Sequence, residues 1–138
     1  NRLRELEATV VSVKSSTELS KPSGYRDVLI VNYGTSSVPL QTNDIAYIYK
    51  QNEVSFIKTT DAKEYTSSAS LETLEELLDP ESFFRLNRQM IGHIKAIRQF
   101  KSDASGKLIL ETQPPFSEEV TVSKKKAAEF KTWMGQKI

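Results

Sequence analysis

The segment of residues 83–89, Phe-Phe-Arg-Leu-Asn-Arg-Gln, has the densest group of side chains that could bind a ligand. Two aromatic residues and a leucine are interleaved with two arginines and two amides. In an extended strand, one face would carry Phe83, Arg85, Asn87 and Gln89, and the other face would carry Phe84, Leu86 and Arg88. Arginine, asparagine and glutamine bind phosphates and read base edges, so the segment is a candidate for nucleic-acid contact.

Each polar side chain here also has a purely structural interpretation. Arg85 could form an internal ion pair with a carboxylate such as Glu111. We favour that pair over a nucleic-acid contact, because the apolar neighbours of Arg85 are expected to be buried. Asn87 could satisfy backbone groups. Arg88 lies past the buried positions and is the better candidate for binding.

A second cluster is formed by Lys124, Lys125 and Lys126, which follow Ser123 at the predicted start of the last helix. The N-terminus of a helix is partly positive, so each cation there costs about 0.3–1 kcal/mol. A phosphate would offset this cost, since ammonium groups, free backbone N–H groups and the Ser123 hydroxyl would surround it. The alternative is a solvated lysine run, and we favour the phosphate site.

A third candidate is the polar segment of residues 50–53, Lys-Gln-Asn-Glu, between two predicted strands. A loop of amides and a lysine can enter a groove of nucleic acid. Taken alone, however, the segment is better explained as an ordinary hairpin tip.

The net charge of +1 conceals an asymmetry. Residues 1–81 contain 8 Lys+Arg and 13 Asp+Glu, a balance of −5, whereas residues 82–138 contain 11 and 5, a balance of +6. A basic half favours an anionic partner, although splits of this size also arise by chance in globular domains.

Several classes of protein are disfavoured. The chain has no cysteine, and therefore no disulfide or thiolate site. His93 is the only histidine, no catalytic triad, metal-ligand spacing or phosphate-loop pattern is present, and we expect neither an enzyme nor a cofactor. With no apolar run of about 18 residues and no visible signal peptide, we expect no membrane span and no membrane partner. The absence of cysteine is compatible with a reducing compartment, and we expect a cytoplasmic protein.

Short strands and two helices would have to position the three clusters. Strands are predicted at residues 26–32, 38–40, 45–50, 54–59, around 65, 94–100, 107–112 and 119–122, with Ile45, Tyr47 and Tyr49 on one face. Their spacing indicates an antiparallel sandwich or barrel. Ser70 should cap a helix with the apolar stripe Leu71, Leu74, Leu77 and Leu78. A second helix should begin at Ser123 and bury Ala127, Phe130 and Met134, with Trp133 beside them.

Residues 1–24 differ from the rest. Leu3, Leu6, Val10 and Val13 form a helical stripe, and residues 15–24 are rich in Ser, Lys and Thr. The chain begins with Asn1, so we expect a piece of a longer protein. We predict the end of a preceding helix and a linker at 1–24, and one domain at 25–138.

Residues 83–91 are very similar to the core signature of the LytTR DNA-binding domain. Residues 44–48, 70–75, 78–80, 120–124 and 130–133 resemble further segments of that family in the same order. The resemblance covers residues 26–134 and is closest to response regulators of the Bacteroidetes type. It implies a mainly β fold, an elongated stack of small antiparallel sheets with one short internal helix and a short C-terminal helix.

The resemblance also implies a function. Such domains bind double-stranded promoter DNA, commonly at direct repeats, through loops placed in successive major grooves. They follow a phosphorylatable receiver domain, controlled by a sensor histidine kinase, so that residues 1–24 would end the receiver helix. The alternative is a β-rich protein-interaction or ligand-sensing module without DNA binding.

Transferred position by position, the resemblance implies DNA contacts in three places. These are the loop of residues 50–54 with Lys50, Gln51 and Asn52, then Arg88 with Gln89, then Lys125 flanked by Ser123, Lys124 and Lys126. The first loop lacks arginine and histidine, so base readout there would rest on Asn52 or Gln51. Many family members have asparagine in place of His93.

Overall fold

The structure, a computed structural model, describes residues 25–135, so the helix and linker predicted at 1–24 lie outside the described residues. The strands are β2 (Val28–Tyr33), β3 (Ser36–Gln41), β4 (Ile45–Gln51), β5 (Val54–Thr59), β6 (Glu64–Ser67), β7 (Phe83–Asn87), β8 (Met90–His93), β9 (Ile97–Ser102), β10 (Leu108–Thr112) and β11 (Val120–Val122). The helices are α1 (Leu71–Leu77) and α2 (Lys124–Gly135), with short 3-10 helices η2 (Thr42–Asp44) and η3 (Ile94–Ala96).

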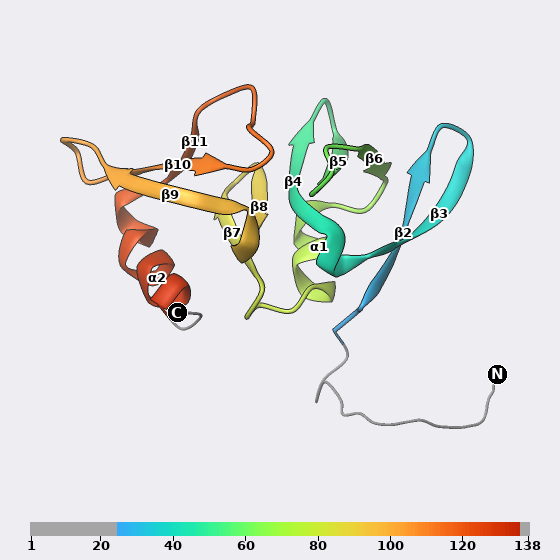
Figure 1. The fold of residues 1–138 in the computed structure, drawn as a ribbon, viewed down its shortest axis with the longest axis horizontal. Helices are drawn as coiled ribbons and strands as arrows, with labels where there is room; N and C mark the ends of the chain where they lie inside the picture. The colour runs from blue at the N-terminus through green and yellow to red at the C-terminus, as the bar shows by residue number, and fades with distance from the viewer. Residues whose placement is uncertain (1–24, 136–138) are drawn as a thin grey trace.

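The strands form two antiparallel sheets along the long axis of the molecule (Figure 1). The larger has the order β3-β2-β6-β5-β4-β8-β7, and the smaller has the order β11-β10-β9. The β2–β3 hairpin stands at one end of the molecule, and the three-stranded sheet with α2 stands at the other. The mainly β, elongated fold is thus confirmed. The barrel suggested by strand spacing is wrong, because the seven-stranded sheet is open, with β3 and β7 at its edges.

Two apolar cores lie on opposite faces of the central strands β4 and β8. On one face, Ile48 and Ile91 pack with the leucines of α1. On the other, Tyr47 and Met90 share a core with β9–β11 and with Phe130 of α2. Central strands buried on both faces keep little freedom to shift register, so the hairpin tips at their ends are placed accurately.

Two β-bulges make part of the predicted assignment of side chains to strand faces wrong. The register of β4 shifts between Ile45 and Tyr47, and Ile45 therefore faces the α1 core while Tyr47 faces the other core. In β7 the register shifts between Arg85 and Asn87, so Asn87 does not share the face of Arg85. A bulge adds one residue to a strand and reverses the alternation beyond it.

The helices follow their predicted signals. Ser70 caps α1, and its hydroxyl oxygen accepts from the Thr73 N–H at 3.1 Å. In α2, Ala127, Phe130 and Trp133 are buried, whereas Met134 is only half-buried.

The buried Tyr47 is expected to make the stability of the fold depend on pH in the alkaline range. Its side chain is fully buried, and burial raises its pKa from 10.0 to about 12. Because the unfolded chain deprotonates first, this contribution to stability is complete below pH 10 and is lost as the pH rises from 10 to 12. Urea unfolding between about pH 9 and pH 11 should show the loss, and Tyr47→Phe should make it shallower. Equal losses in both proteins would contradict the assignment.

Candidate nucleic-acid interface

The β4–β5 hairpin presents the first predicted contact. Its turn consists of Asn52 and Glu53, whose φ angles are +54° and +64°. Positive φ at both positions gives a tight two-residue turn, in which asparagine is readily accommodated. Lys50 lies 3.6 Å from the Glu53 carboxylate and remains exposed, as do Gln51 and Asn52.

The β7–β8 hairpin presents the second contact, with Arg88 and Gln89 exposed at its tip. Asn87 stabilises this turn from inside. Its Oδ1 accepts from the Gln89 N–H at 2.9 Å, and its Nδ2 donates to the Thr121 carbonyl of β11 at 2.9 Å. The backbone-satisfying role considered for Asn87 is confirmed, and Arg88 remains available to a ligand.

The structure brings these two tips together. The Lys50 N–H donates to the Gln89 carbonyl at 2.9 Å, which joins the hairpins through their main chains. One surface depression, with a volume of about 410 Å³, is lined by the residues of both tips, Lys50, Gln51, Asn52, Glu53, Arg88 and Gln89. The first two predicted segments, 38 residues apart between Lys50 and Arg88, therefore form one surface.

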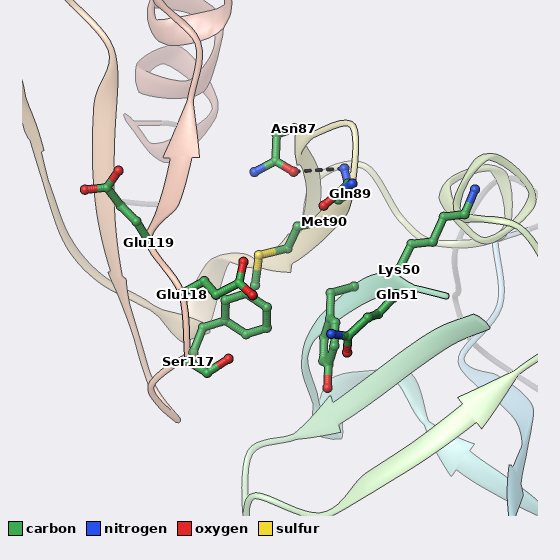
Figure 2. A pocket seen from close by; sticks show the side chains of 10 residues that line it. Lys50, Gln51, Asn87, Gln89, Met90, Ser117, Glu118 and Glu119 are labelled. Carbon is green, nitrogen blue, oxygen red and sulfur yellow. Dashed lines mark hydrogen bonds between the residues drawn. The ribbon is translucent and has the colours of Figure 1, made fainter. Parts of the chain in front are cut away.

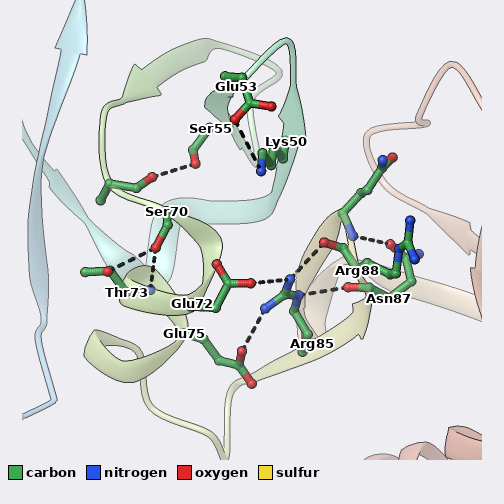
Figure 3. Close-up of polar contacts among 12 residues, drawn as sticks. Lys50, Glu53, Ser55, Ser70, Glu72, Thr73, Glu75, Arg85, Asn87 and Arg88 are labelled. Atoms are coloured by element: carbon green, nitrogen blue, oxygen red, sulfur yellow. Dashed lines mark hydrogen bonds and ion pairs between the residues drawn. The ribbon is translucent and has the colours of Figure 1, made fainter.

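Arg85 lies behind the second tip and does not reach that surface (Figure 3). Its guanidinium pairs with Glu75 at 3.0 Å and with Glu72 at 3.3 Å, both on α1. An internal ion pair was predicted, but the suggested partner Glu111 is wrong. The Glu111 carboxylate accepts instead from Gln99 on the neighbouring strand β9.

The third segment begins α2. The Ser123 hydroxyl and carbonyl oxygens both accept from the Lys126 N–H, at 3.3 and 3.0 Å, so Ser123 caps the helix. Lys124 and Lys125 are exposed. Lys126 turns inward, where its Nζ donates to the Arg85 carbonyl at 2.8 Å and lies 4.9 Å from the centre of the Phe84 ring.

The segment between β10 and β11 was not predicted to approach the site. Phe116 packs edge-on against Tyr47 and Tyr49, and Glu118, two residues on, lies on the side of the cleft that faces the hairpin tips (Figure 2). The Glu119 carboxylate is turned away from the tips and lies 4.0 Å from Lys107 Nζ. The cleft between this segment and the two hairpins has a volume of about 140 Å³. This is below the roughly 300–1,000 Å³ that is typical of pockets for small-molecule ligands. An aromatic residue after the double proline was the only sequence feature that could have indicated this anchor.

His93 has a structural role, as expected. It is buried, its Nδ1 accepts from the Lys95 N–H at 3.0 Å, and its ring meets Phe83 edge-on. Within residues 25–135, the acidic and histidine side chains form no group suited to a metal ion. Neither described helix has the length and apolar character needed to cross a membrane.

Comparisons with known proteins agree with this geometry. Residues 35–135 match the sequence profile of the family described as the LytTr DNA-binding domain. Among four matching solved chains is the LytTr DNA-binding domain of a protein described as a methyl-accepting/DNA response regulator from Bacillus cereus. The two share 22% sequence identity with a TM-score of 0.69, over 80% of this chain and 98% of that one. No curated protein sequence matches the chain.

Proposed function

Because the chain belongs to the LytTr DNA-binding domain family, we propose that it binds double-stranded DNA sequence-specifically, with its hairpin tips inserted in the major groove. The observation that carries this proposal is the joining of two polar hairpin tips by the bond from Lys50 N–H to Gln89 O. A paired and rigid edge of this kind can follow a groove without a recognition helix.

The exposed side chains divide into two roles. Lys124 and Lys125, at the capped start of α2, would contact phosphates, where backbone N–H groups and the helix dipole add to their charge. Arg88, Asn52 and Gln51 carry the donors and acceptors that suit base edges, and Lys125 can also reach a base. Lys126 is bound internally and would act by fixing the start of the helix.

In the cell the domain would serve as the output module of a cytoplasmic transcriptional response regulator. A receiver domain would precede it, a sensor histidine kinase would control the receiver, and the sites would be direct repeats in promoters. Family membership supports the DNA partner and the receiver, and the remaining elements are parts of the proposal.

Fluorescence anisotropy with a labelled duplex at several salt concentrations tests the proposal directly. Each phosphate contact contributes about −0.9 to the slope of log K against log salt, so contacts from Lys124 and Lys125 predict a slope of about −2. Fragments selected from genomic DNA should bind more tightly than random duplexes. Binding that is absent, or independent of salt, would favour the protein-interaction module.

Lys124→Gln should weaken binding to all duplexes alike and lower the salt slope by about one unit, because a phosphate contact carries no sequence information. Lys63→Gln is the matched control. Lys63 is also exposed, but it lies beyond the far end of β5, away from the Asn52 turn. If both variants change the slope equally, general charge rather than a local contact attracts the DNA.

A further inference from the structure

The carbonyl oxygens of the β7–β8 hairpin are bound by protein donors on several sides. Arg85 Nε donates to the Asn87 carbonyl and Arg85 Nη2 to the Arg88 carbonyl, both at 2.8 Å. Lys126 Nζ donates to the carbonyl of Arg85 itself at 2.8 Å, and the main chain of β4 binds the Gln89 carbonyl. The main-chain carbonyl oxygens of the β7–β8 tip therefore accept hydrogen bonds from cationic side chains and N–H groups of the protein itself.

The guanidinium at the centre of this arrangement is itself fixed from α1. It forms ion pairs with Glu72 and Glu75, and only 15% of the Arg85 side chain is exposed. A guanidinium is planar and offers its donors in a fixed fork, so binding on one side determines where the other donors point. Helix α1 is thereby linked through the Arg85 guanidinium to the main-chain carbonyl of Arg88 (Figure 3).

We propose that Arg85 is a positioning residue for DNA binding, which fixes the main chain of residues 87–89 so that Arg88 and Gln89 reach the DNA. The inference rests on the proposed function, in which the Arg88 tip contacts a base edge. Two physical effects support it. A tip ordered in advance loses less conformational freedom on binding, and carbonyl oxygens bound by Arg85 do not face phosphates.

The geometry separates this role from that of a surface ion pair. The Glu72 and Glu75 side chains are 74% and 49% exposed, and pairs with such exposed carboxylates contribute little to stability. The particular contribution of Arg85 is its simultaneous bonding to two successive carbonyl groups. Lysine keeps the charge but presents a single ammonium, which cannot reproduce that fork.

A double-mutant cycle on the full chain tests the proposal, with the affinity for a duplex selected by the wild-type protein as the readout. Arg85→Lys should weaken binding about tenfold in the wild-type background and very little further in the Arg88→Ala background. Glu72→Gln, which leaves the guanidinium in place, is the control and should change affinity less than about threefold. Equal losses from Arg85→Lys in both backgrounds, or none, would overturn the proposal.

Amide hydrogen exchange gives a second readout that does not depend on DNA. Arg85→Lys should accelerate exchange of the Gln89 N–H, which is bonded to Asn87 Oδ1, and should leave the β10 amide of Leu110 unchanged. If Arg85→Lys does not fold, Arg85→Gln, whose single amide group cannot bond the Asn87 and Arg88 carbonyls at once, should show the same local acceleration. Unchanged exchange at Gln89 would overturn the proposal, even if the wild-type protein binds DNA. Failure of the wild-type protein to bind DNA would instead defeat the proposed function.

Discussion

Phe130→Ala should lower the free energy of unfolding by about 3–5 kcal/mol, the largest effect expected from a single substitution in this chain. The Phe130 side chain is completely buried in α2. Its ring meets Phe84, Phe100 and Trp133 at centroid distances of 5.6, 5.2 and 5.7 Å. Alanine would leave a cavity where α2, β7 and the three-stranded sheet meet, and surrounding side chains refill such cavities only partly.

Urea unfolding, analysed by linear extrapolation, measures this loss, and an unchanged slope would assign it to stability rather than to unfolded-state compactness. Ile30→Ala is the control, because Ile30 is 67% exposed on β2 and its truncation should cost within about 0.5 kcal/mol. A loss within about 0.5 kcal/mol for Phe130→Ala as well would contradict the prediction and show that the fold does not depend on this ring.

Most of the fold followed from local signals in the sequence. Residues 54–59 form a strand with the predicted bounds, and Ser70 caps α1, because alternation and capping depend on near neighbours. The errors in the strand faces occur at the bulges in β4 and β7, and the strand predicted at 94–100 begins only at Ile97, because residues 94–96 form the 3-10 helix η3. A bulge in a central strand depends on how side chains pack on both faces of the sheet, and no local residue pattern predicts it.

The candidate site shows the same division. Each of the three polar segments could be identified from residue types alone, since arginine, amides and lysines are the side chains that bind phosphates and base edges. Their mutual placement could not be, because the Lys50–Gln89 bond joins distant segments. The partner of Arg85 was predicted wrongly for the same reason. Glu72 and Glu75, rather than Glu111, lie beside Arg85 because α1 packs on β7 and β8, and the sequence alone does not reveal that packing.

Arg88→Ala should weaken binding to the selected duplex by about 1–3 kcal/mol, or about 5- to 150-fold, and should relax base preference at one position of the site. Arg88 is exposed at the β7–β8 tip, while its main chain is anchored by Arg85. Truncation therefore removes the reading group without disturbing the core. Arg98→Ala, at an exposed position of β9 outside the three segments, removes the same charge and should have a much smaller effect. Wild-type affinity in Arg88→Ala would remove this residue from the interface.

Arg88→Lys then distinguishes the two ways in which Arg88 could contact DNA. A lysine can replace an arginine at a phosphate as a point charge, so affinity and salt slope would survive if Arg88 only neutralised the backbone. Bidentate bonding to guanine O6 and N7 is best made by the planar guanidinium, and its loss should reduce discrimination at one base pair while the salt slope stays nearly constant. We expect the second outcome, because Arg88 shares a surface with the amides Gln51 and Gln89. That surface is suited to base edges, whereas the exposed lysines cluster at the start of α2.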